Sequence, residues 1–105
     1  MMNTAVADKI KAVVQSFIPE AKILLFGSYA RGEQTKDSDY DLLVITKKTY
    51  PPREKINWRT KIHNELVNVF HAPFDVLMDS EEEVNRKKEL LGHIVRYAVK
   101  EGTVL

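Results

Sequence analysis

The stretch from residue 27 to residue 44 constrains the fold of this chain more than any other. It reads G-S-Y-A-R-G-E-Q-T-K-D-S-D-Y-D-L-L-V, follows an apolar run at residues 23–26 and ends in a second apolar run at residues 42–45. Short apolar runs bounded by glycine and polar residues are typical of buried strands. The stretch therefore predicts a strand, a tight turn with a short helix, and a second strand with two aspartates at its start.

Asp39 and Asp41 are the two aspartates at the start of the second strand. Successive side chains on a strand point to opposite faces, so these two share one face and Tyr40 takes the other. Neighbouring carboxylates repel each other unless a cation lies between them. Carboxylate oxygens on a rigid strand suit Mg²⁺, which binds through one or two carboxylates together with substrate phosphates.

The turn at Gly27 and Ser28 can supply the phosphate-binding half of such a site. Glycine allows close approach of the backbone, and N–H groups at a helix start, with a serine hydroxyl, can hold phosphate oxygens. A Gly-Ser pair alone usually marks a turn, and an Asp-x-Asp alone usually marks a solvated strand edge. Their joint spacing between two apolar strands is what points to nucleotidyl transfer.

The composition sets broad limits on the protein. A chain of 105 residues predicts one domain over residues 1–105. With 16 basic and 15 acidic residues, the net charge of +1 gives no argument for a nucleic-acid or membrane surface, so we expect neither direct nucleic-acid binding nor membrane association. The absence of cysteine excludes disulfides and thiolate metal sites. Residues 1–4 lack the basic region of a signal peptide, and we expect a cytoplasmic protein.

Strands alternate with helices along the chain, which predicts the α/β or α+β class with one small mixed β-sheet flanked by helices. Ser80 and Glu83 form a capping-box pattern at the start of the last helical region, and Gly102 suits the C′ position just past its end. The predicted helices are at residues 4–18, 28–32, 53–70 and 81–100, the last bent or broken near Gly92, and the predicted strands are at residues 21–26, 40–46 and 74–78.

Asp75 begins the third predicted strand, in F-D-V-L-M. If the second and third strands are neighbours, Asp75 can lie beside Asp39 and Asp41. Three carboxylates can hold two Mg²⁺ ions about 3.5–4 Å apart, the spacing of two-metal phosphoryl chemistry. Asp75 would also be placed to accept the proton of an attacking hydroxyl. The alternative role for Asp75 is that of an aspartate capping a turn or helix.

These motifs together resemble the DNA polymerase β-like nucleotidyltransferase superfamily, which carries G-S-x10-D-x-D followed by a strand with one more aspartate. The chain is most similar to the minimal nucleotidyltransferases of that superfamily, through G-S-Y-A-R-G, S-D-Y-D-L-L-V and the ending K-E-G-T-V-L. The resemblance covers nearly the whole chain and implies the polymerase β-like nucleotidyltransferase fold.

The resemblance also implies a function. Members of this branch are commonly the antitoxin of a toxin–antitoxin pair whose other half is an all-helical HEPN-domain ribonuclease. It implies that the antitoxin uses ATP and Mg²⁺, with two ions expected, to transfer AMP onto a tyrosine hydroxyl of the toxin. The positions that match the family are Gly27 and Ser28 in the phosphate-binding turn, Asp39 and Asp41 as metal ligands, and Asp75 as the third acidic position.

Arg31 matches the arginine of the family's A-R-G, and two roles stay open for it: a contact to the triphosphate or a salt bridge that fixes the loop. Two other functions also stay open. The chain could be a non-catalytic antitoxin that neutralises its toxin by binding, or a nucleotidyltransferase that acts on a small molecule or an RNA end. The sequence does not specify the nucleobase, the acceptor atom or the stoichiometry of a complex.

Overall fold

Four strands form one mixed sheet in the order β3-β2-β1-β4. The strands are β1 (Lys22–Phe26), β2 (Tyr40–Thr46), β3 (Phe74–Ser80) and β4 (Thr103–Val104). Strand β1 is antiparallel to both of its neighbours, whereas β2 and β3 are parallel and are joined by a long crossover helix. This computed structural model describes residues 3–105; the first two residues of the N-terminal stretch considered above lie outside it.

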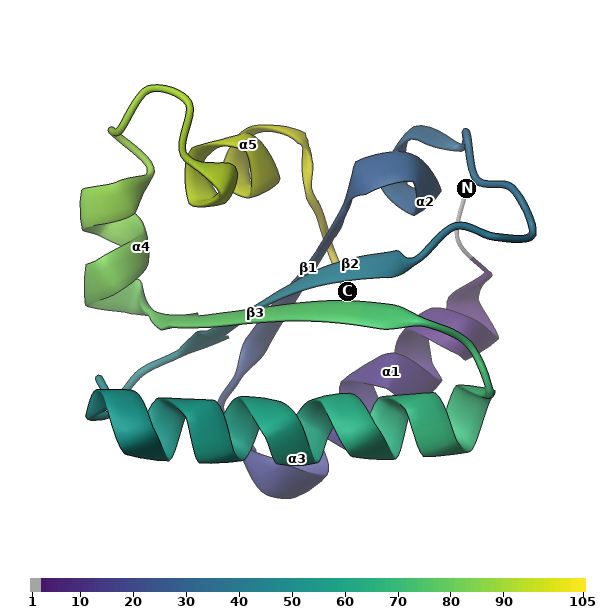
Figure 1. Cartoon of the computed structure of the whole chain (residues 1–105), viewed down its shortest axis with the longest axis horizontal. Coiled ribbons are helices and arrows are strands. Elements are labelled where there is room, and N and C mark those ends of the chain that lie inside the picture. The colour runs from purple at the N-terminus through teal and green to yellow at the C-terminus, as the bar shows by residue number, and fades with distance from the viewer. Residues whose placement is uncertain (1–2) are drawn as a thin grey trace.

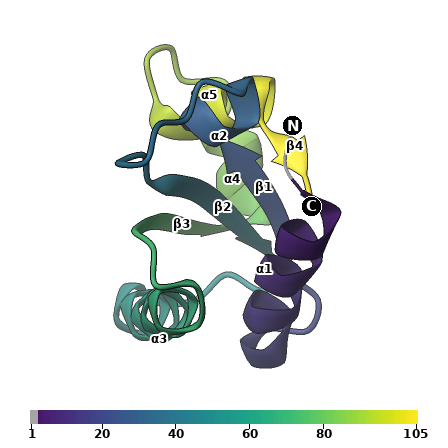
Figure 2. The same ribbon diagram turned by 90° about the vertical axis from the view of Figure 1, so that its right-hand side faces the viewer.

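Helices cover both faces of the sheet (Figures 1 and 2). Helices α1 (Thr4–Phe17) and α3 (Pro52–Phe70) pack on one face, and α4 (Glu81–Lys87) and α5 (Ile94–Glu101) pack on the other. The short helix α2 (Gly27–Arg31) stands at one end of the sheet, next to α5. The predicted class, a small mixed sheet flanked by helices, is confirmed. Over residues 3–105, no helix has both the length and the apolar character that a membrane span requires.

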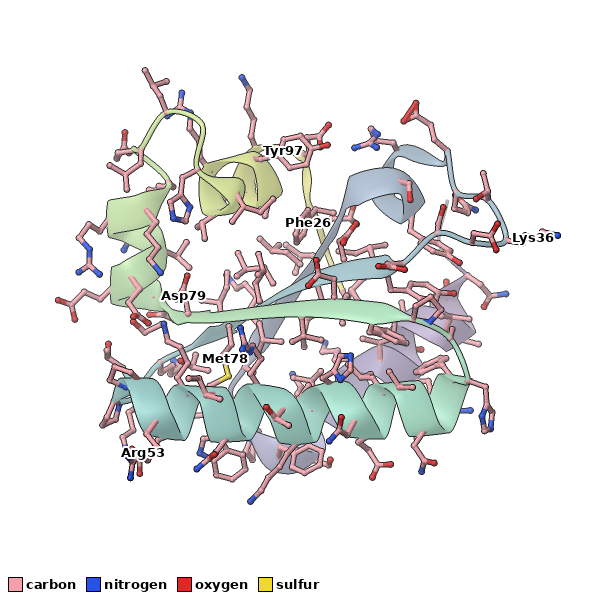
Figure 3. All side chains as sticks on the ribbon, in the orientation of Figure 1. Phe26, Lys36, Arg53, Met78, Asp79 and Tyr97 are labelled. Atoms are coloured by element: carbon pink, nitrogen blue, oxygen red, sulfur yellow. The ribbon has the colours of Figure 1, made fainter. Side chains whose placement is uncertain are left out.

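The alternation of side chains along the strands divides the interior into two cores. Leu42 and Val44 of β2 face α1 and α3, while Leu43 lies between them in sequence and faces α4 and α5. Strand β3 alternates in the same way, and Figure 3 shows Met78 on the side of α3. The neighbouring Asp79 is buried on the other side, where its carboxylate accepts hydrogen bonds from Lys55 at 2.6 Å and Lys87 at 3.0 Å.

The helix starts follow from local sequence. The Asn3 side chain accepts a hydrogen bond from the Ala5 N–H at 2.8 Å and so caps α1. The capping box predicted at Ser80 and Glu83 is present at the start of α4, with both of its hydrogen bonds formed. Each cap satisfies a backbone donor that the first turn of a helix leaves without a partner.

The C-terminal region agrees with the prediction near Gly92 and differs from it in two respects, at Gly102 and in strand β4. The break expected near Gly92 is present, since α4 ends at Lys87, Gly92 adopts a left-handed φ of +78° and α5 begins at Ile94. Gly102 is not in the left-handed conformation that a C′ glycine commonly adopts. It ends α5 in an extended conformation, φ −68° and ψ 151°, where a Cβ would lie 2.4 Å from the carbonyl oxygen of Ala98. Strand β4, which follows Gly102, was not predicted.

The packing of α3 on the sheet can be tested with two apolar residues of that helix. Leu66 is fully buried in the core, whereas Ile56 is 52% exposed. We expect Leu66→Ala to lower the free energy of unfolding by about 2–5 kcal/mol through lost burial and a residual cavity. The control, Ile56→Ala, should change it by less than about 0.5 kcal/mol. Urea denaturation followed by circular dichroism measures both, and equal effects would contradict the packing described here.

Candidate active site

Asp41 and Asp75 lie level with each other on adjacent parallel strands. Their Cα atoms are register partners in the β2–β3 pair, and neighbouring strands lie about 4.8 Å apart. Both side chains belong to the face that carries α4 and α5, because Tyr40 and Phe74, which precede them, pack in the opposite core. Asp39 comes two residues before Asp41, just outside β2. The second and third strands are therefore neighbours, which is the condition under which Asp75 can lie beside Asp39 and Asp41.

The three aspartates differ in their exposure to solvent, since Asp41 is half-buried while Asp39 and Asp75 are exposed. Burial raises the pKa of Asp41, and the negative charges of Asp75 and Asp39 raise it further, while the charge of Arg31 opposes the shift. Ionising Asp41 therefore costs free energy in the folded protein. A cation bound beside this carboxylate would remove that cost.

Gly27 brings the turn after β1 into direct contact with Asp41. Its φ is +74°, and a Cβ at this position would lie 2.1 Å from Oδ2 of Asp41. Only glycine leaves room for the carboxylate here. Phe26 is the N-cap of α2 and provides no side-chain hydrogen bond to the helix start, and the half-buried Ser28 follows Gly27 in the first turn. The predicted phosphate-binding turn thus adjoins the predicted metal-binding carboxylate.

A column of three aromatic rings supports the site from the opposite face of the sheet. Tyr40 stacks on Tyr29, with ring centroids 3.8 Å apart, and on Phe74, with centroids 4.8 Å apart. Each ring is adjacent in sequence to a predicted site residue, and the three come from α2, β2 and β3. The column was not predicted, although the sequence places an aromatic residue directly beside each of these site residues. It fixes the three segments relative to one another.

Arg31 is held by acidic and phenolic side chains. Its guanidinium pairs with Glu33 and, at 3.5 Å, with Glu101, and it donates a hydrogen bond to the hydroxyl of Tyr97. The hydrogen bond to Glu33 is the main cause of a raised pKa for Arg31. The structure shows the salt bridge, and the contact to the triphosphate stays a prediction.

Tyr97 connects α5 to the site. Its ring packs edge-on against Phe26, with centroids 6.2 Å apart (Figure 3), and its hydroxyl meets Arg31. Tyr97 and Glu101 were not predicted as neighbours of the site. No sequence pattern connects them to Arg31, because the contact depends on how α5 packs on the sheet.

The three aspartates are not gathered into a tight cluster. Among residues 3–105, no three His, Cys, Asp or Glu side chains lie close enough together to form a ready-made metal-binding group. The charges of Asp39 and Asp75 nevertheless reach Asp41, and both residues are exposed, so their side chains have space to turn. An all-carboxylate donor set of this kind suits Mg²⁺, which prefers oxygen ligands.

Comparison with known proteins identifies the family. A family model described as the nucleotidyltransferase domain matches residues 7–104. The chain belongs to the nucleotidyltransferase domain family. One relative of this nucleotidyltransferase is a protein of Methanocaldococcus jannaschii named "Putative protein adenylyltransferase MJ0604". The two are 32% identical over 84 residues, which cover 80% of this chain and 76% of the relative.

Solved structures of low identity share the fold of this nucleotidyltransferase. A "toxin-antitoxin with AMP-PNP" aligns with a TM-score of 0.68 and 23% identity, covering 93% of this chain and 70% of the other. A "tri-AMPylated Shewanella oneidensis HEPN toxin in complex with MNT antitoxin" aligns with a TM-score of 0.61 and 19% identity, covering 98% and 71%. At these identities the likeness shows the fold.

The charge on Asp41 of the nucleotidyltransferase predicts a dependence of stability on pH. Because the pKa of Asp41 is raised in the folded state, the folded protein loses stability as pH rises from about 4, the unfolded pKa of aspartate, through the folded pKa. Asp41→Asn lacks this loss. In EDTA at pH 7 we expect the variant to have the higher melting temperature, and the difference should shrink below about pH 4.

Adding Mg²⁺ completes the test, because a ligand that binds only the folded state stabilises it. Mg²⁺ should raise the melting temperature of the parent and leave that of Asp41→Asn unchanged. Asp37→Asn, which removes an exposed carboxylate of the preceding loop, is the control and should respond to Mg²⁺ as the parent does. A variant less stable than the parent in EDTA at pH 7, or one that gains equally from Mg²⁺, would refute this account of Asp41.

Proposed function

We propose that this nucleotidyltransferase is an antitoxin that transfers AMP from ATP to a tyrosine hydroxyl of a partner HEPN-domain toxin. The observation that supports it most is the alignment of Asp41 with Asp75 beside the turn at Gly27 and Ser28. The names of its relatives agree, since one is called an adenylyltransferase of proteins and others are toxin–antitoxin complexes.

Gly27 and Ser28 are the proposed binding site for the β- and γ-phosphates of ATP. The backbone N–H groups at this turn and the Ser28 hydroxyl can donate hydrogen bonds to phosphate oxygens, and Gly27 has no Cβ that would hold the phosphates away. Arg31 lies three residues further on, and its charge reaches the carboxylate of Asp41. It would contribute positive charge near the phosphates, from the position in which Glu33 and Glu101 hold it.

Asp39, Asp41 and Asp75 are the proposed ligands of Mg²⁺, with two ions expected. Bound Mg²⁺ would neutralise the triphosphate and stabilise the charge that develops on the oxygens around phosphorus. The chain's own contribution is to present one half-buried carboxylate and two exposed ones at the end of the sheet. The exposed side chains of Asp39 and Asp75 would turn toward Asp41, and the cation would offset the repulsion that raises its pKa.

The proposed reaction is an in-line displacement at the α-phosphorus of ATP. The oxygen of the acceptor tyrosine forms a bond to this phosphorus, the bond from phosphorus to the bridging oxygen of the β-phosphate breaks, and pyrophosphate leaves. The tyrosine proton passes to the carboxylate of Asp75, which is exposed at the edge of the site and level with Asp41. The product is a partner protein that carries AMP on a phosphodiester bond.

A docked protein is the proposed acceptor because relatives are named as a protein adenylyltransferase and as toxin–antitoxin complexes, and because Asp75 is exposed to an incoming partner. A non-catalytic antitoxin would need neither the glycine that makes room for Asp41 nor a half-buried carboxylate beside two others. Both features carry a cost in the folded protein, and both are present.

One assay tests the proposal. The protein is incubated with ATP labelled on the α-phosphate, Mg²⁺ and the product of the neighbouring gene as the candidate HEPN protein, and label on that HEPN protein is measured. We expect transfer by the parent and a loss of more than about 100-fold in Asp39→Ala and Asp41→Ala, because metal binding and positioning contribute several kcal/mol each. Asp37→Ala, in the same loop but outside the site, should transfer as the parent does.

The outcomes separate the three functions. Neutralisation of the toxin by Asp41→Ala without label would establish inhibition by binding alone. Transfer of label to an RNA end or a small molecule, with none to the HEPN protein, would establish a different acceptor. Labelling of the HEPN protein that neither substitution reduces would show that the carboxylates are not the metal ligands.

A further inference from the structure

A groove runs beside Asp75, at the outer edge of β3. Strand β3 is the first in the order β3-β2-β1-β4, so no strand among residues 3–105 pairs with this edge. Between this edge and α3 lies a groove of about 320 Å³, lined by Arg59, Thr60 and His63 of α3 and by Phe74, Asp75 and Val76 of β3. Helix α3 runs alongside β3 for most of the length of the strand (Figure 1).

The side of the groove formed by α3 carries the guanidinium of Arg59 and the imidazole of His63. Arg59 and His63 are one turn apart and therefore share a face of the helix. Within residues 3–105, no carboxylate lies within ion-pair distance of Arg59. His63 lies beside it, and Nδ1 of its ring is 3.2 Å from Oδ1 of Asn64. The guanidinium of Arg59 thus presents donors for an anionic group in a groove that Asp75 also lines.

The geometry of the reaction determines what approaches from this side. In an in-line displacement, the attacking oxygen and the leaving pyrophosphate lie on opposite sides of the phosphorus. The turn that would hold the leaving phosphates follows β1, whereas Asp75 lies on β3, with β2 between them. The acceptor hydroxyl must therefore arrive from the β3 side, past the groove.

We propose that this groove receives the acceptor segment of the partner protein and that Arg59 binds an anionic group next to the acceptor hydroxyl. The inference rests on the proposed function, because it assigns the acceptor side of the same site. A guanidinium suits this role, since its planar set of N–H donors matches the two oxygens of a carboxylate or phosphate. We assign the anion to a carboxylate of the partner, because the first transfer takes place before any AMP is attached; the phosphate of an attached AMP is the alternative that the test separates.

Steady-state kinetics of AMP transfer to the HEPN protein test the proposal. In Arg59→Ala we expect the KM for the HEPN protein to rise about tenfold or more, the usual effect of losing a hydrogen bond to a charged group. The kcat and the KM for ATP should stay within about twofold, since Arg59 lies away from the nucleotide side of the site. Arg59→Lys should recover part of the loss, because it keeps the charge without the planar fork.

Lys61 provides the matched control. It lies on the same helix, but its ammonium sits over the ring of Trp58, 5.2 Å from the centroid, and it does not line the groove. Lys61→Ala should leave the KM for the HEPN protein unchanged. Melting temperatures of all variants establish that the fold is intact, and a loss in Lys61→Ala equal to that in Arg59→Ala would show a general charge effect in place of a specific site.

The source of the anion is identified by measuring each addition separately, with unmodified HEPN protein and with HEPN protein that already carries one AMP. A raised KM for the first addition identifies a carboxylate of the partner, and a raised KM confined to the second identifies the attached phosphate. If the KM of Arg59→Ala for the HEPN protein is unchanged in both additions while the parent transfers AMP, the groove does not bind the acceptor segment. The proposed function is then unaffected. No transfer by the parent overturns the proposed function and this inference with it.

Discussion

The pairing of β2 with β3 sets Asp41 level with Asp75, and the partial burial of the Asp41 carboxylate beside the charges of Asp75 and Asp39 is the constraint on which the site depends. A parallel register shifted by one residue would send Asp41 or Asp75 to the opposite core. Gly27 adds to the constraint, since its missing Cβ leaves the space that one oxygen of Asp41 occupies. Burial first, and then the charges of Asp75 and Asp39, raise the pKa of Asp41, so ionising this carboxylate costs free energy. Binding of Mg²⁺ together with a triphosphate would remove this unfavourable free energy.

The rest of the fold supplies the stability that offsets this strain. The core under α1 and α3 is apolar and fully enclosed, and the aromatic column through Tyr40 ends directly beneath the aspartates. At the opposite end of β3, the buried Asp79 is satisfied by Lys55 and Lys87. Among residues 3–105 the carboxylates of the site have no comparable lysine partners, which distinguishes them from Asp79 and agrees with their proposed role as ligands of a cation.

Local pattern predicts much of this structure, because strands, caps and the spacing of the site depend on residues close together in sequence. The adjacency of β2 and β3 could be stated only as a condition, since strand order is a property of the whole sheet. Strand β4 was missed because two residues carry no detectable alternation. The contacts of Arg31 with Tyr97 and Glu101 join segments about 70 residues apart and required the packing of α5. The roles assigned to the site residues remain predictions.

Locating the divalent ions is the most direct test of the central claim, that Asp41 and Asp75 share cations with the triphosphate. Crystals grown with Mn²⁺ in place of Mg²⁺ and with a non-hydrolysable ATP analogue would show the ions by anomalous scattering. The account predicts a peak bonded to Asp41 and to at least one of Asp39 and Asp75, with the analogue's phosphates at Gly27 and Ser28. A nucleotide bound elsewhere, or ions that avoid Asp41, would contradict it.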